Sequence, residues 1–304
     1  MKNKIISLEG KVKGYDDIFK STAPETQNSG EVILMDIEKL LPFPGHPFKL
    51  YAGKRLDELV KSIKELGILN AILIRKASEQ SGLYQNLSGH NRANAAKLAG
   101  LKQIKAEIID VDDDTAILIV VDTNFKQREN LLPSERAYGF KMQIEALKRQ
   151  GKRVDLIEDD NKNIKSRELI GQQHGLSGVQ IFKYIRLTEL IPRLLEMLDA
   201  GNFSIKAGVD LSYIKSCSQE LLFKYLQKNN VPHLDNVKAS LLRKANNDIG
   251  LTDDCILEII AKKPDLKNRS ISFKRTELLK YFPSTMSSGE IIQKIYMLIE
   301  NNMI

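Results

Sequence analysis

Apolar residues recur along the chain with two different periods, which predicts a mixed α/β region followed by a helical one. The apolar side chains of residues 54–67 fall on one face of a helix that ends at Gly67. The predicted fold class is α+β. Short strands are predicted at 71–77, 83–87 and 104–111, and a second apolar helix, with aspartates at its start, at 112–125.

Three further boundaries follow from the same pattern. Residues 1–30 are polar, contain proline and glycine, and have no apolar period, so we predict a flexible leader. We predict a small mixed α/β domain at 31–132. Pro133 and Ser134 suit the start of a helix and open a predicted helical domain at 133–215. Residues 216–304 are predicted to be a helical C-terminal region, to which the sequence assigns no role.

Composition narrows the class of protein. The chain has 304 residues, 42% of them hydrophobic, and a formal net charge of +7, which favours a polyanionic partner. We find neither a secretory signal nor an apolar stretch long enough to cross a membrane. The two cysteines, Cys217 and Cys255, are interpreted as structural thiols in a reducing cytoplasm, and the four scattered histidines predict no metal site.

Residues 166–187 have the layout of a helix-turn-helix. We predict a first helix from Ser166 to about His174, a reversal at Gly175, and a second helix capped by Ser177. Val179, Leu187 and either Phe182 or Tyr184 are predicted to face inward. The alternative is a helical corner inside a bundle, with a solvated polar face. The candidate DNA contacts are Arg167, Ser177, Gln180, Lys183 and Arg186, of which the last four recur every three residues on one face.

The segment 87–100, LSGHNRANAAKLAG, places a glycine, a histidine and an arginine where a strand gives way to a helix. Ser88 can cap this helix and Gly89 can form the turn, with His90, Asn91 and Arg92 simply exposed. Alternatively, the free N–H groups of the helix start hold an anion together with Arg92.

A second polar group follows at the end of the apolar helix, in DTNFKQREN. Asn124, Gln127 and Arg128 can be a helix cap with a surface arginine, or they can converge with the first turn on a triphosphate. The candidate nucleotide-binding residues are therefore Ser88, Gly89, His90, Asn91, Arg92, Asn124, Gln127 and Arg128, with His90 and Asn124 as catalytic candidates.

Four elements in this order resemble the ParB partition family, over about residues 32–215. The nearest resemblance is to ParB-like proteins carried on mobile elements of low-GC bacteria. The elements are HPFKLYAGKRLDELVKSIKELGILNAILIRK, LSGHNRANAAKLAGL, NFKQRENLLPSERA and the helix-turn-helix.

The resemblance implies a ParB-like N-terminal domain and a nucleoid-associated protein that binds a centromere-like DNA site. It also implies a CTP pocket with Mg²⁺ that controls closure of a clamp, slow CTP hydrolysis at most, and a ParA-type ATPase as partner. The motifs depart from the family at several positions. His90 and Asn91 stand in place of Glu and the first Arg of a Gly-Glu-Arg-Arg turn, Thr123 and Asn124 disturb a Glu-Asn-x-Gln-Arg motif, and His46-Pro47 stands where the family has Gln-Pro-Arg. Binding is expected to survive these changes better than hydrolysis.

Two other functions fit the residues. A transcription regulator would use the helix-turn-helix and keep the N-terminal domain for protein contacts, and a small-molecule kinase would use a ParB-like fold without DNA. A homodimer on a palindromic site is predicted because one helix-turn-helix covers one half-site. The C-terminal amphipathic helix is expected to form the dimer interface, the seam between the two subunits. Alternatively, it is buried in the core of the chain itself. The apolar residues of that helix are Ile291, Ile292, Ile295, Leu298 and Ile299.

Overall fold

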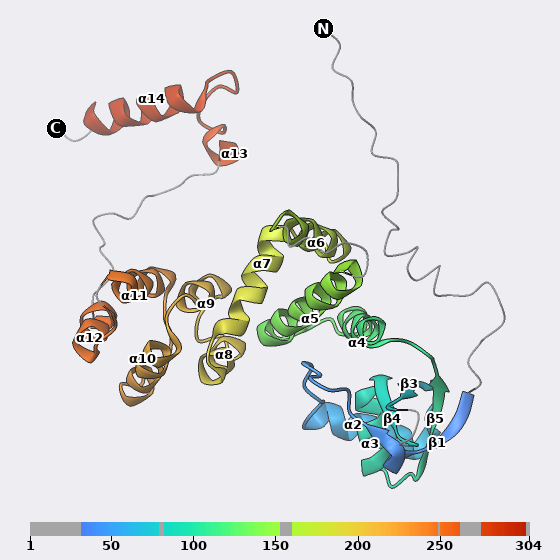
Figure 1. Cartoon of the computed structure of the whole chain (residues 1–304). Helices are drawn as coiled ribbons and strands as arrows, with labels where there is room; N and C mark the ends of the chain where they lie inside the picture. Colours follow the sequence, from blue (N-terminus) through green and yellow to red (C-terminus); the bar gives the residue numbers. More distant parts are fainter. Residues whose placement is uncertain (1–31, 79–81, 153–159, 249, 262–274, 302–304) are drawn as a thin grey trace. The chain divides into compact units, whose positions relative to one another are not determined.

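The computed structural model describes residues 32–78, 82–152, 160–248, 250–261 and 275–301 (Figure 1). Their contacts separate the chain into one compact unit through Ile259 and a second from Ile260 onward. The predicted leader at 1–30 lies outside the described residues. The domain boundaries predicted near residues 132 and 215 remain predictions.

The first unit begins with a mixed five-stranded sheet in the order β1-β5-β3-β4-β2. β1 with β5 and β3 with β4 are antiparallel, whereas β3 with β5 and β2 with β4 are parallel. All three strands predicted from apolar runs are present. The strands are β1 (Val32–Asp36), β2 (Leu40–Leu41), β3 (Ile72–Lys76), β4 (Tyr84–Ser88) and β5 (Gln103–Ile108), with a 3-10 turn η1 (Ile37–Lys39) between the first two.

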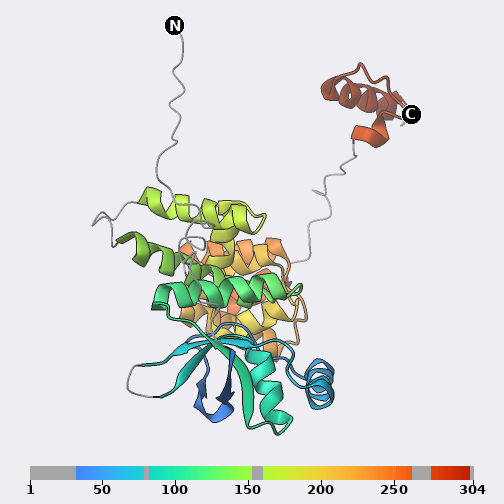
Figure 2. The ribbon, with the colours of Figure 1, turned by 90° about the vertical axis from the view of Figure 1, so that its right-hand side faces the viewer.

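Three helices accompany the sheet. α2 (Lys54–Leu66) and α3 (His90–Leu98) contact each other beside the strands (Figure 2). Ala96 of α3 packs with Ile72 and Ile74 of β3 in one buried cluster. α4 (Asp113–Gln127) supplies Val120 to a second cluster around Leu87 of β4. The predicted helices at 54–67 and 112–125 are confirmed, and Asp112 caps the second by accepting a hydrogen bond from the Thr115 amide at 2.8 Å.

From Pro133 onward, the described part of the first unit is helical, as the sequence predicts. A third cluster joins Phe140 of α5, Ile170 of α6 and Ile181 of α7. The helices are α5 (Pro133–Lys152), α6 (Asp160–Gln173), α7 (Gly178–Arg186), α8 (Pro192–Asp199), α9 (Ile205–Leu211), α10 (Ser216–Lys228), α11 (Asn236–Asp248) and α12 (Asp253–Ala261), with a 3-10 turn η2 (Leu187–Glu189) after α7.

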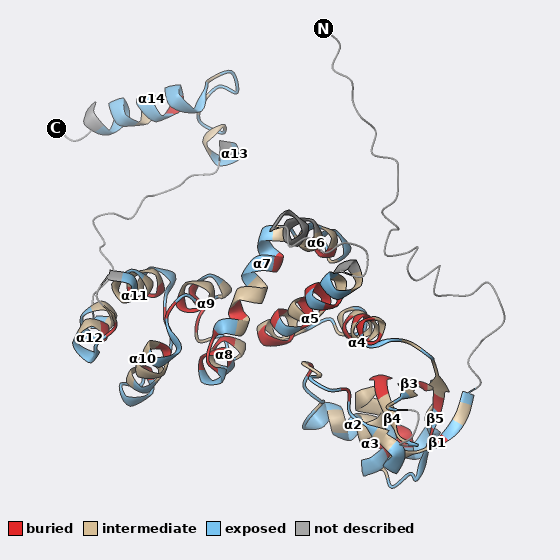
Figure 3. Cartoon of the chain, in the orientation of Figure 1, coloured by how far each residue is buried: buried red, intermediate tan, exposed pale blue. Residues whose placement is uncertain are grey.

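The second unit contains α13 (Arg275–Leu278) and α14 (Ser288–Asn301). α14 is the predicted C-terminal amphipathic helix. Ile291 is buried, but most of the other described side chains of α14 are exposed, including Ile292, Tyr296 and Ile299 (Figure 3). Within the second unit the apolar face is therefore mostly uncovered, and whether it packs on the core of the chain or on a second subunit remains a prediction.

Candidate nucleotide pocket and DNA-contacting helices

The turn between β4 and α3 requires glycine. Gly89 has φ of +98°, and a Cβ atom there would lie 2.6 Å from Cγ2 of Ile72 and 3.0 Å from Nη2 of Arg92. Gly89 itself is the N-cap of α3, while Ser88 is the last residue of β4 and is buried. The prediction that Ser88 caps the helix is therefore wrong, because the strand continues through Ser88 and takes its backbone out of the cap position.

A cavity of about 160 Å³ opens at this turn. All eight residues predicted for nucleotide binding line it, so the structure brings the β4–α3 turn and the end of α4 together. Tyr51 and Leu59 also line the cavity. They were not predicted, because in the sequence Leu59 is an ordinary apolar position of α2 and Tyr51 lies in the loop before that helix. The ten lining residues are Tyr51, Leu59, Ser88, Gly89, His90, Asn91, Arg92, Asn124, Gln127 and Arg128.

The polar side chains of the cavity are already oriented by the protein. Nη1 of Arg92 donates to the carbonyl oxygens of Asn70 and Ala71 at 2.6 and 2.9 Å. Oδ1 of Asn91 accepts from the Tyr51 amide at 2.8 Å, and Nδ2 of Asn124 donates to the Val120 carbonyl at 2.8 Å. A bound anion would thus meet a guanidinium whose position is fixed in advance, which lowers the entropic cost of binding.

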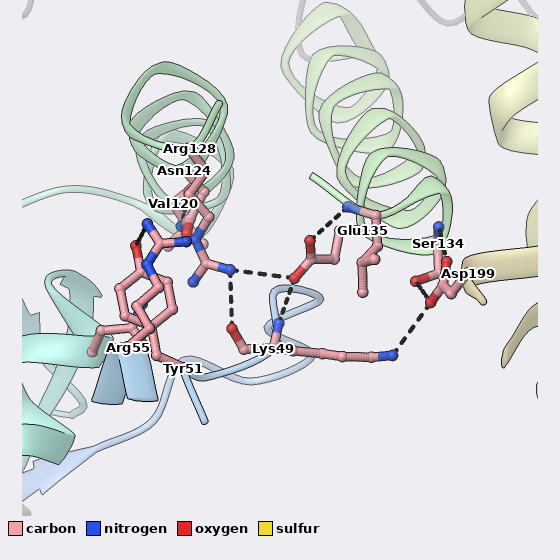
Figure 4. A network of polar contacts seen from close by, with 11 residues as sticks. Lys49, Tyr51, Arg55, Val120, Asn124, Arg128, Ser134, Glu135 and Asp199 are labelled. Atoms are coloured by element: carbon pink, nitrogen blue, oxygen red, sulfur yellow. Dashed lines mark hydrogen bonds and ion pairs between the residues drawn. The ribbon is translucent and has the colours of Figure 1, made fainter. Parts of the chain in front are cut away.

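Arg128 joins the cavity to a network of polar contacts (Figure 4). Nη1 donates to the Lys49 carbonyl at 2.9 Å and lies 3.2 Å from Oε1 of Glu135. The Glu135 carboxylate also accepts from the backbone amides of Lys49 and Leu132, at 2.7 and 2.9 Å. Burial lowers the pKa of the Arg128 guanidinium, and the Glu135 carboxylate opposes that change. Each charge of this pair therefore stabilises the other away from water.

The loop that contains Lys49, before α2, also contacts the end of α8. Nζ of Lys49 lies 3.3 Å from Oδ2 of Asp199. The Asp199 carboxylate also accepts from the Ser134 amide and hydroxyl, at 3.0 and 2.6 Å, at the start of α5. The loop beside the cavity is consequently tied to two elements of the helical region (Figure 4).

Two histidines stack behind the β4–α3 turn. The ring centroids of His46 and His90 are 3.8 Å apart, and both Nε2 atoms are buried without a hydrogen-bond partner. Burial lowers the pKa of His46 to about 4, and burial together with the neighbouring His46 lowers the pKa of His90 to about 3. His90 is therefore neutral at pH 7 and supplies no positive charge to an anion.

The residues that line the cavity suit the phosphates of a nucleoside triphosphate better than they suit magnesium. Burial lowers the pKa of the Arg92 guanidinium, so an anion that compensates its charge in the cavity is favoured. Magnesium prefers hard oxygen ligands, usually carboxylates, yet none of the ten lining residues is acidic. The catalytic candidates His90 and Asn124 offer a neutral imidazole and a neutral amide oxygen.

The helix-turn-helix is present in α6 and α7. Gly175 has φ of +65°, and a Cβ atom on Gly171 would collide with the Leu176 carbonyl oxygen, so both glycines allow the tight turn. Ser177 forms a reciprocal capping box with Gln180. Leu176, in the turn between the two helices, packs against the buried cluster that holds Ile181.

Two details of that prediction are wrong. α6 begins at Asp160, so Ser166 lies within the helix and does not start it. Val179 is exposed, and the buried residue of the first turns is Ile181, because packing against α5 turns that face of α7 inward. Leu187 is buried and Tyr184 packs against the same cluster, as predicted.

The candidate DNA contacts differ in their surroundings. Lys183 is exposed, whereas Ser177 and Gln180 hold each other in the capping box. The Arg186 guanidinium donates to the Ser212 carbonyl at 2.5 Å and lies 4.2 Å from the ring centre of Tyr213, so it also stabilises the contact of α7 with α9. Arg167 lies 5.1 Å from the ring centre of Phe182.

In the described part of the chain, no helix is both long and apolar enough to cross a membrane.

Comparison with known proteins identifies a family for the N-terminal part of the chain. A family model described as the ParB N-terminal domain matches residues 21–125. The chromosome-partitioning protein Spo0J of Thermus thermophilus is 30% identical over 197 residues, which is 65% of this chain and 65%, just under two thirds, of the relative. The probable chromosome-partitioning protein ParB of Campylobacter jejuni is 27% identical over 269 residues, covering 88% of this chain and 87% of the relative.

Among solved structures, the C-terminally truncated ParB of Caulobacter crescentus complexed to the centromeric parS site is similar, with a TM-score of 0.41 and 23% identity. The match covers 70% of this chain and 98% of that one. The family match agrees with the ordered motifs on either side of the β4–α3 turn: residues 21–125 match the ParB N-terminal domain, and the longer chain is similar to chromosome-partitioning proteins.

Proposed function

We propose that this protein binds a specific double-stranded DNA site through α6 and α7 and acts in DNA partition. The observation that carries the proposal is the helix-turn-helix itself, in which α7 is fixed on α5 by Ile181 while Gln180 and Lys183 remain exposed. The net charge of +7 favours a polyanion, and curated relatives are named chromosome-partitioning proteins. The proposal covers chromosomal, plasmid and mobile-element DNA alike.

The contacts are proposed to divide into two kinds. Lys183, with its exposed ammonium group, suits a phosphate, and such a contact strengthens binding to all sequences alike. Gln180 uses its side-chain oxygen in the capping box, so its Nε2 is the group left to donate, and we assign this donor to a base edge. Arg186 and Arg167 are placed nearer to protein groups and are assigned supporting contacts with the backbone of the DNA.

The cavity at Gly89 is proposed to bind a nucleoside triphosphate, CTP by family resemblance. Its support is the convergence of Arg92, Arg128 and the N–H groups at the start of α3, which together attract phosphates. Hydrolysis is proposed to be slow, because phosphoryl transfer needs a cation held near the phosphates and a positioned water. Because no residue that lines the cavity is acidic, the cavity is poorly suited to holding the cation and to positioning the water.

The protein is further proposed to work as a homodimer, with α14 as a seam and a ParA-type ATPase as partner. The exposed apolar side chains of α14 support the first part of this proposal. The second part follows from the family alone.

Gel-shift titrations test the DNA proposal. The probe is the duplex recovered when the full-length protein selects from a random-sequence pool. Lys183→Ala is expected to weaken binding to every duplex similarly, whereas Gln180→Ala relaxes sequence preference by about 1–3 kcal/mol if its amide reads a base.

Lys228→Ala is the matched control, because it removes the same charge from an exposed position on α10. Circular dichroism checks that Gln180→Ala, which also removes half of the capping box, leaves α7 helical. Unchanged affinity and preference after alanine replaces Gln180, Lys183 and Arg186 together would overturn the proposal.

A further inference from the structure

Two apolar side chains stand on the outer face of α7. Val179 is 64% exposed and Phe182 is 36% exposed, although Ile181 between them is fully buried. Three residues apart in a helix, Val179 and Phe182 lie on one face. They are surrounded by the exposed polar side chains of Gln180 and Lys183, so the outward surface of α7 has an apolar centre.

A single exposed apolar side chain is ordinary in a folded protein. The position of this pair is more informative, because both belong to the first two turns of the second helix of a helix-turn-helix. Those turns are the part of such a helix that meets base edges in the major groove. The turn is held rigid by the capping box of Ser177 and by the close packing at Gly171, so the pair is presented in a fixed orientation.

The charges around the pair also match DNA. The guanidinium of Arg167 lies 5.1 Å from the ring centre of Phe182, and Lys183 follows Phe182 directly. An apolar centre with cations beside it suits a groove whose floor carries an apolar group and whose walls carry phosphates. In the major groove of DNA, the apolar group on a base edge is the C5-methyl group of thymine.

We propose that Val179 and Phe182 recognise thymine methyl groups in the DNA site of this protein. The inference rests on the proposed function, since it requires that α7 enters the major groove. It assigns part of the sequence preference to methyl contacts, in addition to any hydrogen bonds that Gln180 makes with bases.

The test replaces thymidine by deoxyuridine in the selected duplex. This change removes the methyl groups and keeps every hydrogen-bonding group of the base. At one fixed salt concentration, we expect the wild-type protein to bind the uracil duplex about 3- to 10-fold more weakly for each methyl group that Val179 or Phe182 touches. Single replacements along the duplex then locate the bases concerned.

Val179→Ala and Phe182→Ala are expected to bind the thymine duplex more weakly and to discriminate less well between the two duplexes, and the double variant does not discriminate at all. Val237→Ala is the matched control, because Val237 is exposed on α11, outside the helix-turn-helix. It is expected to discriminate as the wild-type protein does. Because Val179 and Phe182 are exposed, neither substitution opens a cavity in the core beneath α7, and helix content by circular dichroism should be unchanged.

The outcomes separate this inference from the proposed function. Sequence-specific binding with equal affinity for the thymine and uracil duplexes overturns the methyl recognition alone. Full discrimination by the double variant also overturns it. Failure to select any preferred sequence overturns the DNA-binding proposal, and this inference with it.

Discussion

The guanidinium of Arg128 and the carboxylate of Glu135 form an ion pair away from water, with Nη1 3.2 Å from Oε1 and side chains only 8% and 4% exposed. Glu135 also accepts from the amides of Lys49 and Leu132. One carboxylate therefore holds the cavity arginine, the loop before α2 and the start of α5. Removing either charge leaves the other buried and uncompensated.

We expect Glu135→Gln to lower the free energy of unfolding by about 1–3 kcal/mol, because the amide keeps the shape but has neither the charge nor the second accepting oxygen. Urea unfolding at pH 7 measures this change. Glu65→Gln makes the same substitution in an exposed pair with Lys61 and should have no measurable effect. Equal stability of the two variants would show that the buried pair contributes nothing.

Gly89→Ala is expected to abolish CTP binding measured by calorimetry. The new Cβ would contact Ile72 and Arg92 and would also strain a backbone with φ of +98°. Gly100→Ala, at the other end of α3, carries a similar strain (φ +83°) but meets no atom within 4 Å, so it should keep CTP binding.

Arg92→Ala should also fail to bind CTP, whereas phosphate release by the wild-type protein should stay near background even with its DNA. Absence of CTP binding by the wild-type protein at millimolar concentration would mean that the turn is only a helix start. Brisk phosphate release would mean that His90 or Asn124 replaces the missing acid.

The buried histidines predict a loss of stability in acid. Because the pKa values of His46 and His90 are lowered to about 4 and about 3, the folded state keeps both neutral while the unfolded state takes up protons below about pH 6.5. Their contribution is complete above pH 6.5 and declines as the pH falls, toward about 4 for His46 and toward about 3 for His90.

Unfolding free energies at pH 7.5 and 5.5 should therefore differ by about 1 kcal/mol for each histidine. His90→Gln should reduce this difference in unfolding free energy by the contribution of one histidine. His233→Gln changes an exposed histidine and should leave the difference as it is. An unaltered pH dependence in His90→Gln would contradict the assignment.

If α14 is the dimer seam, charges on its exposed apolar face should separate the subunits. Ile292→Glu combined with Ile299→Glu is expected to halve the mass measured by light scattering, because the carboxylates would have to be buried in the seam. Lys294→Glu, at an exposed polar position of the same helix, is the control and should keep the dimer. A dimer that survives the double change must use another surface.

The cavity could be predicted from the sequence better than its surroundings. The Gly89 turn and the end of α4 carry local signals, namely a glycine before a helix and amide and guanidinium groups after an apolar run. Tyr51 and the loop contacts of Glu135 and Asp199 join segments far apart in the chain, and no local pattern indicates them. Their role became visible only in the folded arrangement.

The errors in the helices have a similar origin. α6 starts at Asp160, earlier than the predicted start at Ser166, in a polar stretch with no apolar period. On α7, helical spacing was interpreted as placing Val179 inward. Packing against Phe140 of α5 and Ile170 of α6 selects Ile181.

Genome-wide immunoprecipitation of the protein from its own cells tests the partition proposal most directly. A partition protein of this family is expected to occupy one locus and a broad region of DNA on both sides of it, and Lys183→Ala should reduce the signal there, whereas the control Lys228→Ala should not. Sharp, separate peaks at many promoters would contradict partition and identify a transcription regulator. No enrichment on DNA at all would contradict DNA binding by α6 and α7.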